Sequence, residues 1–215
     1  MELDDVLPLK PRLRGRIHQL TVVAAIAGLV WLVRVAPTTR ATVAAWVYGV
    51  ASVLLYLTSS TYHVFARSPR ARRILQRADH SMIYVLIAGS FTPVALLLVA
   101  DPWRWVALAL MWGGATVGVV LKLVALERFQ RLGATLYIAL GWAGLMALPA
   151  LWQRPGTLAL VVAGGVLYTG GAILFFLQRP RLAPGWFGYH ELWHAFGVAA
   201  GIVFFVVNLR LIRAG

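Results

Sequence analysis

Seven apolar stretches, each close to the length of a membrane-spanning helix, run through this sequence of 215 residues. A helix needs about 20 mainly apolar residues to cross a hydrocarbon core about 30 Å thick. The connections between the stretches are too short to hold a separate soluble domain, so the sequence predicts one all-α domain over residues 1–215, a bundle of seven transmembrane helices. The stretches cover residues 17–35, 41–63, 80–100, 103–124, 132–152, 157–178 and 190–209.

Composition agrees with a membrane protein, because 60% of the residues are hydrophobic and only 13% are charged. The formal net charge of +13 would also suit a nucleic-acid-binding protein, but the basic residues are distributed in a way that argues against that class. Fourteen of the 20 Lys and Arg residues precede the first stretch, or lie in connections or at their edges on the same side of the membrane: Lys10, Arg12, Arg14, Arg16, Arg67, Arg70, Arg72, Arg73, Arg77, Lys122, Arg128, Arg131, Arg179 and Arg181.

This asymmetry predicts the orientation of the protein. By the positive-inside rule the amino terminus is cytoplasmic, and an odd number of crossings puts the carboxyl terminus outside. We expect a multi-pass protein of the cell (plasma) membrane whose basic connections contact the anionic headgroups of the inner leaflet, with no nucleic-acid partner. The sequence gives no indication of oligomeric state. Because it contains no cysteine, any metal ion must be bound through nitrogen and oxygen.

The last apolar stretch begins with two histidines in a pattern that suits metal binding. His190 and His194 are four residues apart, so they lie one helical turn apart on the same face. Their alternative interpretation is a pair of membrane-surface histidines that bind no metal. Glu191 lies about 100° further round the helix than His190, and we interpret it as a dipole-favoured acid of the first turn, or alternatively as an acid that supports a ligand.

Other polar residues are expected at the same side of the membrane. His63 ends the second stretch, one turn after Ser59, and Asp79 comes directly before the third stretch. Asp79 also suits an ordinary helix cap. Since ionisable groups at membrane depth are costly, the convergence of three imidazoles and one carboxylate from three helices indicates a functional site. His18 is expected among the headgroups and, like His80, receives no metal role.

Three histidines and one open position form a catalytic zinc pattern. His63, His190 and His194 are therefore the predicted zinc ligands. Asp79 is the predicted catalytic residue that orients and deprotonates the zinc-bound water, or alternatively it holds one of the ligands in place, and Ser59 is expected to hydrogen-bond that water or an oxyanion. A kink at Pro93 is expected to open a cavity between the helices.

These residues resemble the haemolysin III family, the bacterial branch of the progestin and adipoQ receptor proteins. The resemblance rests on five features: the Pro11-Arg12-Leu13-Arg14-Gly15 lead-in, Ser59-x-x-x-His63, Asp79, Thr92-Pro93, and His190-x-x-x-His194. It implies a seven-helix bundle with a cytoplasmic amino terminus and a zinc ion held by the three histidines, with Asp79 beside the water that completes the coordination. The wider relatives include alkaline ceramidases, so the implied chemistry is hydrolysis of a lipid amide.

Three functions remain open at this stage. The first is a zinc-dependent hydrolase of lipid amide or ester bonds that acts in membrane-lipid homeostasis, with membrane lipids as substrates. The second is a non-enzymatic membrane sensor or homeostasis factor in which zinc only joins helices. The third is a cytolysin, which the seven apolar helices disfavour, because a secreted pore-forming protein must be soluble before it inserts.

Overall fold

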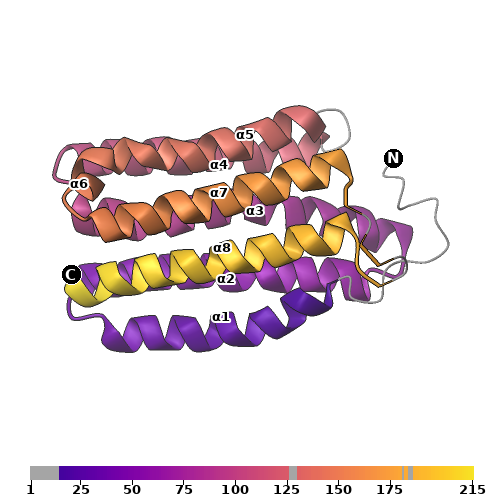
Figure 1. Ribbon diagram of the computed structural model, residues 1–215, viewed down its shortest axis with the longest axis horizontal. Coiled ribbons are helices and arrows are strands. Elements are labelled where there is room, and N and C mark those ends of the chain that lie inside the picture. Colours follow the sequence, from indigo (N-terminus) through magenta and orange to yellow (C-terminus); the bar gives the residue numbers. More distant parts are fainter. Residues whose placement is uncertain (1–14, 126–129, 181, 184–185) are drawn as a thin grey trace.

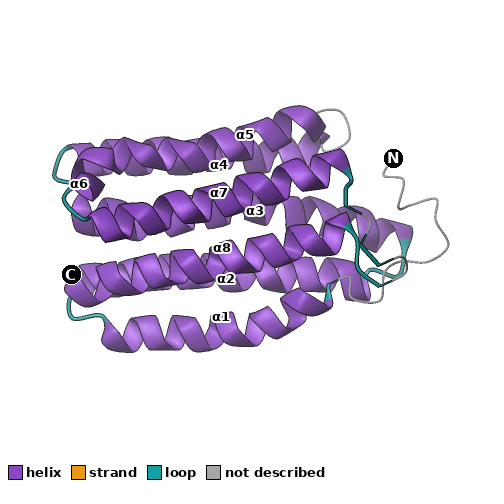
Figure 2. Cartoon of the chain, viewed as in Figure 1, coloured by secondary structure: helices purple, strands orange, loops and turns teal. Residues whose placement is uncertain are grey.

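The computed structural model describes residues 15–125, 130–180, 182–183 and 186–215. Within these residues, seven helical segments are long and apolar enough to cross a membrane (Figure 1, Figure 2). The predicted all-α, seven-helix fold is confirmed, and the chain is a multi-pass membrane protein. The helices are α1 (Arg16–Val35), α2 (Thr39–Phe65), α3 (Pro69–Leu98), α4 (Trp103–Ala125), α5 (Gln130–Ala143) with the 3-10 turn η2 (Gly144–Ala147) and α6 (Leu148–Trp152), α7 (Pro155–Leu177) and α8 (Tyr189–Ala214).

The helices run side by side along one axis (Figure 1). The most extensive packing is of α2 against α3, of α7 against α8, of α3 against α4 and of α1 against α2, while α8 also contacts α1, α2 and α3. Because the chain reverses at each short connection, α1, α3 and α8 all begin at the same end of the bundle, where α2 ends. We call this end, marked by Arg16, Pro69 and Tyr189, the site end.

The third helix starts earlier than the sequence indicated. It begins at Pro69, after Ser68, whose Oγ accepts a hydrogen bond of 3.1 Å from the backbone N–H of Ala71. A serine cap followed by proline is a favourable helix start. Arg70, Arg72, Arg73 and Arg77, which the sequence placed among the residues of a connection, form the first turns of α3, while Arg67 precedes the helix. The interpretation of Asp79 as a cap is therefore wrong, because Asp79 lies inside the helix.

The predicted continuous helix over residues 132–152 is interrupted. The α-helical pattern ends at Ala143 and resumes after the 3-10 turn η2. Pro149 explains the break, because it has no N–H to donate to the carbonyl of Leu145 four residues earlier. Irregular backbone at membrane depth is tolerated where it is covered by protein or lines a cavity. Gly144 and Leu145 of this turn do line the cavity described below.

Two tyrosine rings are seated on glycines of neighbouring helices. A Cβ atom at Gly118 of α4 would collide with the ring of Tyr84 of α3, and a Cβ at Gly201 of α8 would collide with the hydroxyl of Tyr56 of α2. Both tyrosines are buried. The missing side chains at these two glycines therefore let α3 pack closely on α4 and α2 on α8, which brings the polar residues of the site end together.

Candidate metal centre

Three histidine side chains from two helices meet at the site end. His63 lies in the last turn of α2, and His190 and His194 lie one turn apart at the start of α8. Nitrogen atoms of the three rings, one from each, lie within 4.8 Å of one another. The group is buried, with His190 8% and His194 4% exposed. These residues can therefore hold a metal ion.

The start of α8 is fixed by Glu191. Its Oε2 accepts a hydrogen bond of 2.8 Å from the backbone N–H of Gly188, and the whole residue is buried. A carboxylate in the first turn satisfies a backbone donor and is favoured by the helix dipole. The predicted position of Glu191 in the first turn of α8 is confirmed, while its alternative role as an acid that supports a ligand stays a prediction. By fixing where α8 begins, Glu191 sets the direction in which His190 and His194 point.

The spacing of the imidazole nitrogens suits a tetrahedral metal. Nε2 of His190 lies 3.3 Å from Nε2 of His63. Two ligands at about 2.0–2.1 Å from a tetrahedral zinc ion are separated by about 3.3–3.4 Å, so this pair already has the spacing that zinc requires. The third nitrogen lies within 4.8 Å, close enough to join them after a small side-chain movement. Imidazole ligands also suit copper, iron and nickel, so the ligand set admits zinc without excluding these metals.

Asp79 and Ser59 lie beside the histidine cluster. Oδ2 of Asp79 is 3.9 Å from Nε2 of His63. Ser59 is 1% exposed, and its Oγ makes no hydrogen bond of good geometry with the described residues, although it is close enough to Asp79 to interact with it. A buried hydroxyl without a hydrogen bond is costly unless it meets water or a ligand. The structure thus brings both predicted residues to the cluster, and their catalytic roles remain predictions.

A fourth histidine joins the cluster, contrary to the sequence interpretation. His18, in the first turn of α1, was expected among the headgroups, but it is 6% exposed and its Nε2 lies 3.2 Å from Nδ1 of His194. The two rings meet edge to face, with their centroids 4.1 Å apart. The expectation for His18 is therefore wrong. It was based on the lack of a polar neighbour four residues away in the same helix, whereas the partner is on α8.

The contact with His18 distinguishes the two ring nitrogens of His194. Since Nδ1 of His194 faces His18, Nε2 is the nitrogen that can face a metal ion. Metal-binding histidines usually have such a partner on the second nitrogen, which fixes the tautomer and the ring orientation. The topology offered a signal for this role, because α1 begins at the same end as α8.

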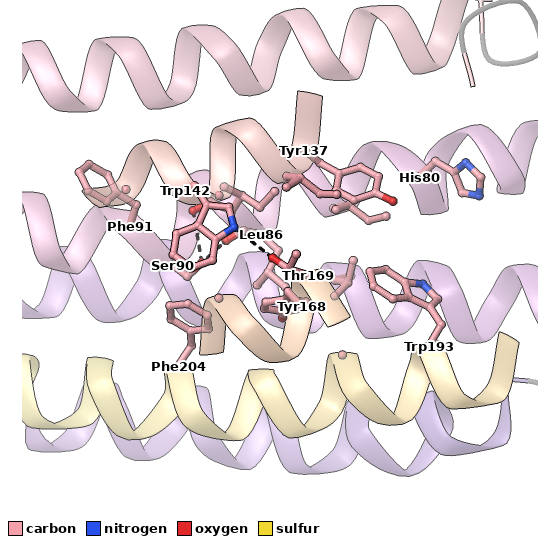
Figure 3. A pocket seen from close by; sticks show the side chains of 18 of the residues that line it. His80, Leu86, Ser90, Phe91, Tyr137, Trp142, Tyr168, Thr169, Trp193 and Phe204 are labelled. Atoms are coloured by element: carbon pink, nitrogen blue, oxygen red, sulfur yellow. Dashed lines mark hydrogen bonds between the residues drawn. The ribbon is translucent and has the colours of Figure 1, made fainter. Parts of the chain in front are cut away.

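A cavity of about 230 Å³ extends from the cluster into the bundle. Ser59, Asp79, His190 and His194 line it at the site end, and most of the remaining wall is apolar. Figure 3 shows the deeper part, where Leu86, Trp142 and Phe204 surround the cavity and Trp142 donates a hydrogen bond of 3.0 Å to Thr169 Oγ1. Ser90, Phe91 and Val94 also line it. These three residues flank Pro93, so the cavity expected beside this proline is present.

Fold and site together define a class: multi-pass membrane proteins with seven spanning helices and a buried histidine cluster that can hold a metal ion. The sequence matches the family described as haemolysin-III related over residues 8–205. The chain belongs to this family, so the resemblance seen in the sequence motifs is confirmed.

Three relatives illustrate how far the similarity extends. The chain is 33% identical over 193 residues to Hemolysin-3 of Bacillus cereus, which covers 87% of this chain and 85% of that protein. It is 30% identical over 200 residues to the Hemolysin-3 homolog of Bacillus subtilis (strain 168), with 88% and 89% covered. It is also 30% identical over 178 residues to the heptahelical transmembrane protein ADIPOR2 of Oryza sativa subsp. japonica, with 74% and 78% covered.

Proposed function

We propose that this protein is a zinc-dependent, ceramidase-like hydrolase of lipid amide or ester bonds that acts in the lipid homeostasis of the plasma membrane. One observation carries the proposal: Ser59, Asp79, His190 and His194 lie together on the wall of a mainly apolar cavity. Metal ligands next to a carboxylate provide hydrolytic chemistry, and an apolar cavity suits a lipid chain.

In this proposal His63, His190 and His194 hold the zinc ion. The 3.3 Å separation between the Nε2 atoms of His63 and His190 supports this assignment. When bound, zinc supplies Lewis-acid polarisation of a carbonyl oxygen and makes water more acidic. Nε2 of His18 contacts Nδ1 of His194 and holds this ring in place. Nε2 of His194 therefore stays directed at the site.

Asp79 is the general base. Its Oδ2 and the Nε2 of His63 are 3.9 Å apart, a separation across which a water molecule can be held. From this position the carboxylate takes the proton of the attacking water and returns it to the leaving amine or alkoxide. The Ser59 hydroxyl, one turn before His63, donates to the carbonyl oxygen as negative charge develops on it.

We place the site at the cytoplasmic leaflet, with the amino terminus inside and the carboxyl terminus outside. Arg70, Arg72, Arg73 and Arg77 lie in the first turns of α3 at the site end, where they would contact anionic headgroups. A lipid would enter sideways between helices and place its chain in the apolar part of the cavity. The protein wall would then separate the reacting carbonyl from bulk water.

The decisive experiment follows fatty acid released from a native lipid extract by mass spectrometry. Asp79→Asn should lower the rate at least about 100-fold, the low end for losing a general base, while leaving zinc content unchanged. The matched control is Asp101→Asn, because Asp101 lies in the connection before α4, far from the cluster, and pairs with Arg104 in the first turn of α4. Product formation that survives Asp79→Asn, or no product from any lipid class, would contradict the hydrolase proposal.

A second candidate is a non-enzymatic membrane sensor or homeostasis factor with structural zinc. It is favoured by the contacts His18–His194 and His63–His190, which connect α1 and α2 to α8. In that case stripping zinc should lower the unfolding temperature, and no lipid extract should yield a product. Measuring fatty-acid release together with the unfolding temperature of the zinc-free protein therefore separates the two candidates.

A further inference from the structure

A buried lysine lies on the wall of the same cavity, on the side formed by α3 and α4. Lys122 belongs to the last turn of α4 and is 5% exposed. Within the ranges that the structure describes, its Nζ makes no hydrogen bond and no ion pair. The side chain is covered by protein while it lines the cavity, and an ammonium in such an apolar space favours a group that supplies negative charge.

Packing holds the ammonium in place. A Cβ atom at Gly133 of α5 would collide with Nζ and Cε of Lys122, so the lysine occupies the space that the glycine leaves open. The same position lies beside the hydroxyl of Tyr84, which donates a hydrogen bond of 2.5 Å to the carbonyl of Gly133. The lysine stem is therefore enclosed by α3 and α5.

This arrangement differs from that of a lysine that reaches towards the membrane surface. Such lysines bury the stem and leave the charged head in water. The neighbouring Arg77 of α3 behaves in that way, because it is half-buried and its guanidinium donates a hydrogen bond of 2.9 Å to the carbonyl of the exposed residue Leu123. Lys122 is instead covered and directed to the cavity, although the sequence placed it among the basic residues of a connecting segment.

The described residues around Lys122 supply no anion that pairs with it, which favours an anionic ligand. Gln76 and His80 line the cavity with it, and His80 is close enough to interact with it electrostatically. Asp79 is the only carboxylate among the cavity-lining residues that the structure describes, and it is engaged at His63. Among the residues that the structure describes, the lysine side of the cavity therefore offers an ammonium and an amide, with no acid paired to the ammonium.

The cavity extends from this polar end along the bundle. Figure 3 shows His80 near one end and Phe91 at the other, with Tyr137 and Trp193 between them on opposite sides. An elongated apolar space that begins at a buried ammonium is complementary to an amphiphile with an anionic head.

We propose that Lys122, with Gln76 and His80, binds the anionic carboxylate or phosphate group of an amphiphile whose chain occupies this cavity. The ammonium donates charge-assisted hydrogen bonds to the head, and the apolar wall covers the chain. The anion has two sources, a fatty acid or a phospholipid headgroup. Because binding at Lys122 requires no hydrolysis, the proposal holds for an enzyme and for a sensor alike.

The test is native mass spectrometry of the full-length protein in non-ionic detergent, with oleate, oleoyl lysophosphatidate and uncharged oleyl alcohol as separate probes. Lys122→Met keeps the length of the side chain and removes its charge. Losing a hydrogen bond to a charged group should weaken oleate or lysophosphatidate binding at least about tenfold. Oleyl alcohol should bind the variant and the wild type equally.

Two further variants make the result decisive. Arg40→Gln removes an exposed charge in the first turn of α2, at the opposite end of the bundle, and should leave the binding of both anionic probes unchanged. Gly133→Ala keeps the lysine but displaces its ammonium, so it should weaken anion binding as Lys122→Met does. A loss for only one anionic probe identifies the source of the anion. Unchanged binding of both anionic probes to Lys122→Met, or an equal loss for oleyl alcohol, would overturn the proposal.

Discussion

Replacing His18 with alanine tests whether the contact between α1 and α8 supports metal binding. The substitution removes the 3.2 Å contact between His18 Nε2 and His194 Nδ1 and the ring packing at 4.1 Å, while the three proposed ligands stay in place. Losing such a partner of a metal-binding histidine typically weakens metal affinity about 10- to 100-fold. This corresponds to about 1.4–2.7 kcal/mol of binding free energy. His18→Ala should therefore bind zinc more weakly by that factor without losing the site.

Competition with a zinc chelator measures this affinity directly, and the visible spectrum of the cobalt-substituted protein reports the ligand geometry. Thr21→Val is the matched control on α1, because the Thr21 hydroxyl donates its hydrogen bond to the carbonyl of Ile17 in its own helix. The variant should bind zinc as the wild type does. If His18→Ala has wild-type zinc affinity and an unchanged cobalt spectrum, His18 does not position His194 and the reasoning fails.

Two further predictions concern the metal and the topology. Protein purified without a histidine tag should contain one zinc ion per chain, and changing His63, His190 and His194 together to alanine should remove it; metal that survives this change would place the site elsewhere. Reporter domains fused after Arg67, between α2 and α3, and after Gly215 should report opposite sides of the membrane, with the first cytoplasmic. The same signal from both fusions would contradict an odd number of crossings.

The sequence predicted the parts of the site that follow from helix geometry and alternation. The spacing of His190 and His194 puts them on one face, and the odd and even order of the spans brings His63 and Asp79 to the same end. These relations depend only on the helical repeat and on the direction of each crossing. That is why four residues from three helices could be predicted together before any contact was known.

The helical repeat and the direction of each crossing do not predict side-chain contacts between helices that are distant in the sequence. The role of His18 depends on how α1 is rotated against α8, and rotation is set by side-chain packing rather than by hydropathy. Lys122 was counted as a connecting-segment charge because composition gives depth along the helix but not the direction in which a side chain points. The start of α3 was also missed. Hydropathy places the helix start after the charged residues, whereas Ser68 and Pro69 begin the helix before them.

The metal site at the histidine cluster and the ammonium of Lys122 both add positive charge to the wall of one cavity. With a divalent cation at the histidines, the cavity wall would carry the positive charge of that ion and of the Lys122 ammonium. Among the described residues, Asp79 is the one carboxylate on the wall that offsets this charge. Uncompensated positive charge in a low-dielectric bundle is unfavourable, so binding of metal and binding of an anionic amphiphile should support each other. Reciprocal linkage then requires zinc to raise the affinity for oleate and oleate to raise the affinity for zinc by the same factor. Since Lys122 lies on the side of α3 and α4 and the histidines lie on α2 and α8, this coupling would pass through the ligand itself, and it would be lost in Lys122→Met without any change at the metal ligands.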